Sequence, residues 1–445
     1  MKSTTPTYRS RTFQITNRKV LVLALPMTLG YLTTPLLGMV HTAVVGQFGS
    51  AALLGGLAAG AVVLDLVLAT FNFLRSGTTS LIAQAFGSGD FEEERAVFWR
   101  AIILAVLSGL TLVLVAPLIA AVSEWFLNAE QPVTAAMNLY IRIRLISAPV
   151  AFINYVIFGY VLGRGNAPLG LFLQLLVNGI NIVFSIAFGL YLGWGISGVA
   201  WGALCSETAA MIVGMVTVYR LFRPKISGRD KFDIVAMIRM LRLNRDMMIR
   251  SLGLVAAYSL FTRQSAQLGT LTLATNEVLL RIFLFSGYFL DGFAAAAQQL
   301  AGRAVGARDQ QAFLRTVQLT AGWGFALAGL ASVLIWAFGE QLIGSITSIA
   351  EVRAVAVHYL PWAAFAALSG VPAFQMNGVF TGATWSREMR NAMLVSFAAF
   401  VAALFTFGAM FGNHGLWAAL HVFLLVRGLG LLLAMPHCFR STFAK

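Results

Sequence analysis

The sequence predicts an all-α integral membrane protein with about twelve transmembrane helices in two pseudo-symmetric six-helix lobes. Of the 445 residues, 59% are hydrophobic and only 11% are charged, whereas soluble domains carry about 25% charged residues. Apolar stretches of about 20 residues, the length that crosses a bilayer, recur along the whole chain. Landmark residues also repeat at a single spacing. These three observations together favour a duplicated membrane bundle.

The candidate spans form two sets of six. In the first half they cover residues 20–46, 52–74, 96–123, 140–162, 168–192 and 196–219. In the second half they cover residues 249–272, 278–302, 317–338, 354–380, 391–411 and 415–435. Because the total is even, we expect both termini on the same side of the membrane.

The repeat is visible in five residue pairs that share one offset of 219 positions. These pairs are Tyr140 and Tyr359, Gly159 and Gly378, Gly163 and Gly382, Gly87 and Gly306, and Asp90 and Asp309. A duplicated unit explains them best. We therefore expect an N-terminal lobe at 1–225, a basic cytoplasmic linker at 226–248 and a C-terminal lobe at 249–445. Whatever moves through the protein should pass between the lobes.

The net charge of +14 does not indicate nucleic-acid binding, because the cations lie in connectors and tails between apolar spans. This distribution is the positive-inside pattern. It predicts a multi-pass protein of the bacterial cytoplasmic (inner) membrane with cytoplasmic termini and linker. Arg142, Arg144 and Arg353 violate the pattern, and we interpret Arg75 as an anchor near the cytoplasmic end of the second span.

An enzyme is not expected. The five histidines are scattered, and the two cysteines, Cys205 and Cys438, have no metal-ligand spacing. Neither a nucleophile elbow nor a paired-carboxylate motif is present. We therefore predict no metal site and no cofactor other than a coupling ion.

Ionisable residues inside the first-half spans are candidates for function. His41 is the only titratable group in the body of the first span, Asp65 lies deep in the second, and Glu207 lies near the middle of the sixth. A carboxylate there costs roughly 2.5–3.5 kcal/mol to insert, so it needs a partner, a proton or a water-filled cavity. The alternative for each is a purely structural hydrogen bond or ion pair.

A stripe of polar residues marks the fifth span. In the fifth span Gln174, Asn178, Asn181 and Ser185 share one helical face. We expect this face to line a hydrated cavity, with interhelical hydrogen bonding as the alternative.

The second half carries its polar residues in the seventh and eighth spans. They are Arg263 in the seventh and Arg281, Asp291 and Gln298 in the eighth. Asp291 lies about 15 Å along the helix from Arg281, so it must find another partner or face water.

Several stretches resemble one transporter family. They are LALPMTLGYLTTPLLGMVHTAVVGQFGS (23–50), FLRSGTTSLIAQAFG (73–87), VNGINIV (177–183), FTRQSAQLG (261–269) and GRAVGARD (302–309). They resemble multidrug and toxin extrusion (MATE) transporters of the DinF-like branch, within the MOP superfamily. The resemblance covers both halves. It implies a monomeric secondary antiporter that exports cationic or amphipathic small molecules by alternating access, driven by H+ or Na+.

The sequence departs from this family at its coupling residues. Relatives carry Asp where this chain has His41 and Ser185, and Glu where it has Gln298. The resemblance therefore does not supply a proton carrier. Either His41 takes that role, or coupling has moved to Asp65, Asp291 or Glu207 or has been lost.

A second function stays open within the same superfamily, a lipid-linked oligosaccharide flippase. Such a protein needs cations in its cavity to bind a pyrophosphate head, and Arg263 and Arg281 are available for this.

Overall fold

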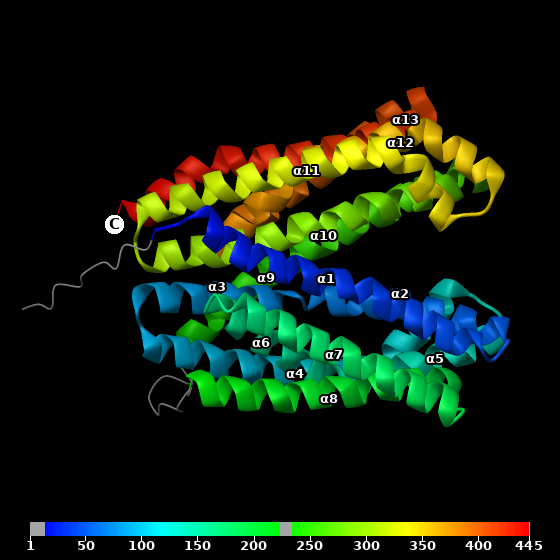
Figure 1. Cartoon of the computed structure of the whole chain (residues 1–445), viewed down its shortest axis with the longest axis horizontal. Coiled ribbons are helices and arrows are strands. Elements are labelled where there is room, and N and C mark those ends of the chain that lie inside the picture. The colour runs from blue at the N-terminus through cyan, green and yellow to red at the C-terminus, as the bar shows by residue number, and fades with distance from the viewer. Residues whose placement is uncertain (1–13, 223–233, 445) are drawn as a thin grey trace, which may run out of the picture.

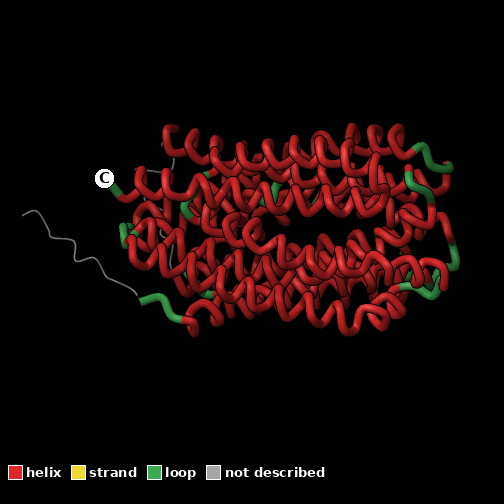
Figure 2. Tube along the Cα trace, turned by 90° about the horizontal axis from the view of Figure 1, so that it is seen from above, coloured by secondary structure: helices red, strands yellow, loops and turns green. Residues whose placement is uncertain are grey.

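The computed structural model describes residues 14–222 and 234–444, and every regular element within them is helical (Figure 2). The first group is α1 (Asn17–Gly46), α2 (Ala51–Thr70), α3 (Phe73–Ser88), α4 (Phe91–Leu127), α5 (Gln131–Ile146), α6 (Ala148–Gly163), α7 (Ala167–Ile186), the π-helical η1 (Ala187–Tyr191) and α8 (Gly195–Phe222). The second group is α9 (Ile234–Gln267), α10 (Thr270–Gly306), α11 (Gln310–Ile346), α12 (Ala350–Gly382) and α13 (Ser386–Phe443). The all-α class is confirmed. Residues 226–233 of the expected linker lie outside the described residues.

The helices contain the twelve expected apolar segments. Within the described chain, nine helical stretches, with α2 and α3 counted as one, are long and apolar enough to cross a membrane. The pair α5 and α6, bent by 52°, gives a tenth. The 58-residue α13 holds two expected spans, because Gly412 interrupts it with a φ of 55° and a ψ of −125°. The remaining expected span lies in α9, which has 34 residues.

The helices run further than their apolar segments. Helix α3 continues to Ser88 and α10 to Gly306, so the connectors that follow them are only a few residues long. Helix α9 begins at Ile234, and residues 234–248 of the expected linker are therefore helical. Polar and basic residues are tolerated in these extensions because a helix satisfies its own backbone hydrogen bonds wherever it leaves the hydrocarbon layer.

The 219-residue repeat is present in the local structure. The Asp90 carboxylate accepts a hydrogen bond of 2.9 Å from the Glu93 backbone N–H and caps α4. The Asp309 carboxylate accepts one of 2.9 Å from the Ala312 backbone N–H and caps α11. An aspartate at this position satisfies a free N–H of the first turn and interacts favourably with the helix dipole. Both halves therefore begin an equivalent helix in the same way.

Close helix packing repeats at the same offset. A Cβ atom added to Gly159 of α6 would lie 2.7 Å from the carbonyl oxygen of Arg75 in α3. One added to Gly378 of α12 would lie 2.2 Å from that of Ala294 in α10. Only glycine allows backbones to approach this closely. The α3–α6 pair of one half thus matches the α10–α12 pair of the other.

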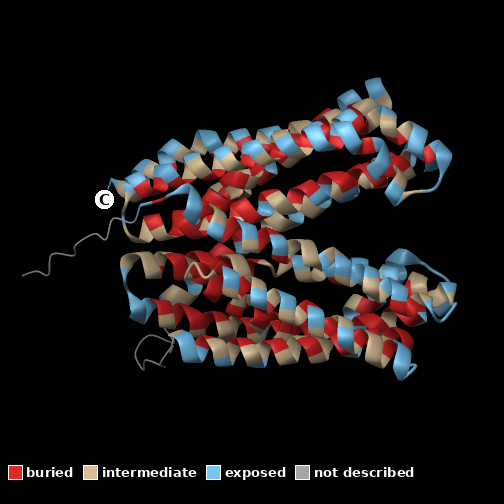
Figure 3. Cartoon of the chain, viewed as in Figure 1, coloured by how far each residue is buried: buried red, intermediate tan, exposed pale blue. Residues whose placement is uncertain are grey.

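The helices form two groups that touch at one end (Figure 1). Helices α1–α8 enclose one apolar core and the second group encloses another. A third core joins α1 to α10, α11 and α13 near the end that carries the C-terminus. Helix α9 belongs to both groups, since Met240 and Leu243 pack into the first core and Phe261 into the second. Buried residues reach the boundary between the groups at this end (Figure 3).

Candidate functional site

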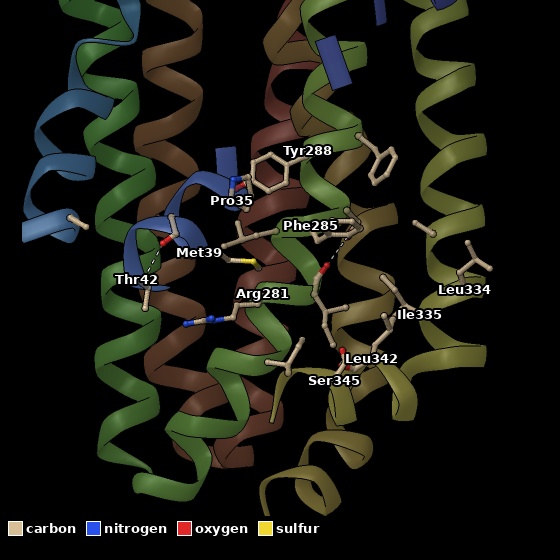
Figure 4. Close-up of a pocket in the computed structure, with 18 of the residues that line it drawn as sticks. Pro35, Met39, Thr42, Arg281, Phe285, Tyr288, Leu334, Ile335, Leu342 and Ser345 are labelled. Atoms are coloured by element: carbon tan, nitrogen blue, oxygen red, sulfur yellow. Dashed lines mark hydrogen bonds between the residues drawn. The ribbon is translucent and has the colours of Figure 1, made fainter. Parts of the chain in front are cut away.

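A cavity of about 1390 Å³ separates the two lobes. It lies between α1, α2 and α5 on one side and α10 and α11 on the other (Figure 4). Its walls are mainly apolar and include Met39, Phe285, Phe289 and Leu334. It extends to Ile346, the last residue of α11, and so reaches the end of the molecule opposite the C-terminus. We call this the open end.

The opposite end, which we call the closed end, is held by hydrogen bonds between the lobes. The side-chain amide of Gln84 donates to the Gly382 carbonyl at 2.8 Å. The amide of Gln298 donates to the Ser76 carbonyl at 2.7 Å and to the Ser80 hydroxyl at 3.0 Å. Gln298, a predicted coupling residue, therefore lies in the contact between the lobes.

The closed end is also the tightest contact between the lobes. A Cβ added to Gly87 would lie 2.1 Å from the carbonyl oxygen of Arg303, and one added to Gly306 would lie 1.9 Å from that of Gln84. Each of these residues is 219 positions from its counterpart across the contact. The pseudo-twofold relation therefore passes through the crossing of α3 and α10.

His41 stands on the cavity wall and begins a chain of polar groups. Its Nε2 lies 3.0 Å from the Asn181 side-chain oxygen, which also accepts a 2.9 Å hydrogen bond from the Ser185 hydroxyl. Asn178 donates to the Thr33 hydroxyl at 2.6 Å. Asn178 and Asn181 are only 6% and 4% exposed. Asn178 and Asn181 therefore make the interhelical hydrogen bonds that the sequence left as the alternative, and neither belongs to the lining of the cavity between the lobes.

Glu207 is paired within the first lobe. Its carboxylate accepts from the Arg144 guanidinium at 3.0 Å, and both side chains are nearly buried, at 12% and 13% exposed. Arg144 also donates to the Ser147 hydroxyl at 2.8 Å. Arg144, one of the three exceptions to the charge pattern, lies inside the bundle as the partner of Glu207.

Asp65 is exposed in the second half of α2. It lies within electrostatic range of Arg144 and, across the boundary between the lobes, of Tyr288. Tyr288 lines the cavity. Asp65 is therefore close to the cavity, without a direct ion pair among the described residues.

Asp291 is exposed in the middle of α10, one turn beyond Tyr288. Three arginines from three other helices surround it electrostatically: Arg75 of α3, Arg427 of α13 and Arg250 of α9. The guanidinium carbon of Arg75 lies 5.3 Å from the ring centre of Tyr31 in α1. The interpretation of Arg75 as a membrane anchor is therefore wrong, since it points between helices.

Sequence reasoning missed this cluster of Arg75, Arg250, Arg427 and Asp291. The available signal was Arg427, a cation in the middle of the last apolar stretch, where an unpaired charge indicates function. Arg263 and Arg281, the two arginines of the second half that the sequence suggested as cavity cations, do not belong to this cluster. Arg281 lines the cavity, and Arg263 is exposed on α9 away from the cavity lining.

Metal chemistry has no support in the described part of the chain, where no group of three or more His, Cys, Asp or Glu side chains is placed to hold an ion. His358 and His414 do lie together, with ring centres 5.4 Å apart. The Nδ1 atom of His414, however, accepts a 2.9 Å hydrogen bond from the Trp362 indole. This pair therefore belongs to an aromatic contact between α12 and α13.

A two-lobed helical bundle with a central cavity, open at one end and closed at the other, defines a membrane transporter. The MatE family model matches residues 26–187 and 247–407. The chain belongs to the MatE family, and it is accordingly a multi-pass membrane transporter and not an enzyme.

Similar proteins agree with this assignment. The chain is 34% identical to the DNA damage-inducible protein F of Escherichia coli over 417 residues, covering 92% of this chain and 90% of that one. It is 24% identical to a probable multidrug resistance protein NorM of Chromobacterium violaceum, covering 93% and 92%.

Solved structures share the fold. The Vibrio cholerae MATE transporter VcmN matches with a TM-score of 0.90 at 19% identity, covering 96% of this chain and 98% of that one. An outward-facing multidrug resistance MATE family transporter of the MOP superfamily matches with a TM-score of 0.88 at 20% identity, covering 96% and 97%.

Proposed function

We propose that this chain is a secondary active multidrug antiporter that exports amphipathic small molecules by alternating access. The observation that carries the proposal is the large apolar cavity between the lobes, which reaches one end of the bundle while the other end is sealed by interlobe contacts. This cavity has room for a drug-sized ligand, since its volume of about 1390 Å³ exceeds the roughly 300–1,000 Å³ of typical small-molecule pockets. The protein acts as a monomer, and its only cofactor is the coupling ion, H+ or Na+.

The open end faces the outside of a bacterial cytoplasmic membrane. The connectors at that end, such as residues 47–50, 192–194 and 347–349, contain no Lys or Arg. Connectors at the closed end include Arg164 and Arg308. Cations remain preferentially on the cytoplasmic side, and this asymmetry supports a cytoplasmic C-terminus and closed end.

His41 carries the coupling proton in this scheme. It is reached from the open cavity, and its ring is held by Asn181 of α7. An unperturbed imidazole changes charge near pH 6.5, close to the working range of a proton gradient. Protonation from the outside would change the charge of the cavity wall and alter the hydrogen bond between α1 and α7, so proton entry and substrate release become linked.

The test is efflux of a fluorescent amphipathic dye from proteoliposomes under an imposed pH gradient, and separately under a Na+ gradient. We expect transport against the dye gradient in wild type, loss of it in His41→Ala, and a displaced pH profile in His41→Asp. Dye movement in neither gradient would remove the proposed function. An unchanged pH profile in His41→Ala would keep the function and remove His41 as the carrier.

A flippase for lipid-linked oligosaccharides is the second candidate, favoured by one observation. Arg281 projects into the cavity, where a pyrophosphate head would need a cation (Figure 4). Arg263, the other cation considered for this role, is absent from the cavity lining. Comparing the movement of a fluorescent lipid-linked pyrophosphate with that of the dye, in the same vesicles, separates the two functions.

A further inference from the structure

The charge of the cavity differs from what a site for cations needs. Among the described residues that line it, the ionisable groups are Arg281, His41 and two tyrosines, and no carboxylate is present. Cationic ligands are normally held by negative or aromatic groups. The lining supplies aromatic surface, but its one fixed charge is positive.

A further group of charges, whose members do not line the cavity, begins on the same helix as Tyr288. Asp291 follows the lining residue Tyr288 by one helical turn, and both interact electrostatically. The charges of Arg75, Arg250 and Arg427, on three other helices, act electrostatically on this carboxylate. Within the described chain, no ion pair joins any of them to Asp291. Three guanidinium groups therefore share one carboxylate that contacts none of them directly.

Arg427 is the most unusual of the three. It is only 5% exposed, and in the described structure neither a hydrogen bond nor an ion pair satisfies its guanidinium. The Nε of Arg250 is likewise buried without a hydrogen-bond partner. Burying an arginine without a partner is strongly unfavourable, and its planar fork of donors matches carboxylate, sulfonate and phosphate groups. Such side chains are expected where a ligand supplies the missing acceptors.

We infer that Arg250 and Arg427 bind the anionic headgroup of an amphipathic substrate, whose apolar tail lies along Phe285 and Phe289 in the cavity. The inference deepens the proposed transport function and rests on it. Arg281, further toward the open end, attracts the headgroup along the same path. When no ligand is bound, the negative charge of Asp291 offsets part of the positive charge of these arginines. The resemblance to MATE transporters implies cationic or amphipathic substrates; this inference keeps the amphipathic substrate and gives its headgroup a negative charge.

A matched pair of probes tests the sign of the charge. Octanesulfonate and octyltrimethylammonium have the same tail and opposite heads. Binding to the full-length protein in uncharged nanodiscs is measured calorimetrically. We expect octanesulfonate to bind at least about ten-fold more tightly. Arg427→Gln and Arg250→Gln should each weaken its binding about 10- to 100-fold, the range for loss of a charged hydrogen bond.

Three further variants separate a binding role from a structural one. Arg427→Lys keeps the charge but loses the planar fork, so its affinity for octanesulfonate should lie between those of wild type and Arg427→Gln. Asp291→Asn removes the competing carboxylate and should tighten octanesulfonate binding. Arg263→Gln changes an exposed arginine of α9 that is not among the charges acting on Asp291; it is the matched control and should bind as wild type does.

The inference is overturned if the ammonium probe binds more tightly, or if Arg427→Gln and Arg263→Gln lose affinity equally. Transport of the two probes in proteoliposomes distinguishes the remaining cases. If sulfonate binds but neither probe is moved, the headgroup site stands and the proposed exporter is removed. Ammonium that is moved while sulfonate is not keeps the exporter and removes the inference. A fluorescent anionic phospholipid in the same vesicles shows whether the amphipathic anion comes from the bilayer, which supports the same headgroup site.

Discussion

Adding one methyl group to the closed end should change which state of the transporter is populated. In Gly306→Ala the new Cβ would lie 1.9 Å from the carbonyl oxygen of Gln84 in the opposite lobe. Ordinary contacts of this kind lie at about 3.4–4 Å, so α3 and α10 must separate by well over an ångström. The clashing atom belongs to the backbone and cannot rotate away.

The clash of the added methyl group raises the free energy only of the state in which the lobes touch at the closed end. Overpacking of a close contact costs about 1–3 kcal/mol. Because 1.4 kcal/mol corresponds to a factor of ten, the equilibrium should move about 5- to 150-fold toward the state in which the closed end has opened. Transport should fall, since one of the two states of the cycle becomes poorly populated.

The shift is measured with spin labels on cysteines placed at Phe48 and Ser348, both exposed at the open end on opposite lobes. Their separation should decrease in Gly306→Ala as the open end closes. Gly322→Ala in α11 is the control, because its added Cβ would meet nothing within 4 Å. An unchanged distance distribution with normal transport in Gly306→Ala would refute the reasoning.

Two further predictions concern the first lobe and the membrane orientation. Glu207→Gln leaves the nearly buried Arg144 without its counter-ion and should lower the free energy of unfolding by about 3–5 kcal/mol, which is measured as a lower Tm. Replacing both residues by leucine and methionine should recover most of this stability. Equal Tm values in wild type and Glu207→Gln would contradict the pairing. In a variant without native cysteines, Ser348→Cys should react with an impermeant thiol reagent from outside and Gln310→Cys should not, and the reverse pattern would invert the topology.

The sequence was sufficient for the fold class because its signals are local. A span must be apolar over about 20 residues, and this requirement appears wherever a helix crosses the membrane. The glycines and aspartates at the 219-residue offset are also local requirements. Asp90 and Asp309 each cap the helix that follows, and Gly159 and Gly378 each allow a close approach. Such residues can be recognised without knowing their partners.

Helix ends were less predictable, because hydropathy marks only the part of a helix inside the hydrocarbon. Helix α9 begins at Ile234, well before its apolar segment. Arg75 lies in the first turn of α3, inside the stretch that α2 and α3 form together, although the sequence suggested a position near the end of a span. When only the neighbouring sequence is known, a positively charged residue is interpreted as part of a loop or as a membrane anchor. Its position between helices depends on packing.

The sequence alone thus determined the membrane class, the duplicated halves and which polar residues lie in apolar spans. Only the tertiary structure decided which of them meet. It paired Glu207 with Arg144 of another helix, placed Asn181 against His41, and gathered Arg250 and Arg427 around Asp291. The physical reason is that an ion pair or a hydrogen bond joins residues far apart in the chain. Its partner is selected by how the helices pack and rotate, and hydrophobicity along a single helix contains no record of that choice.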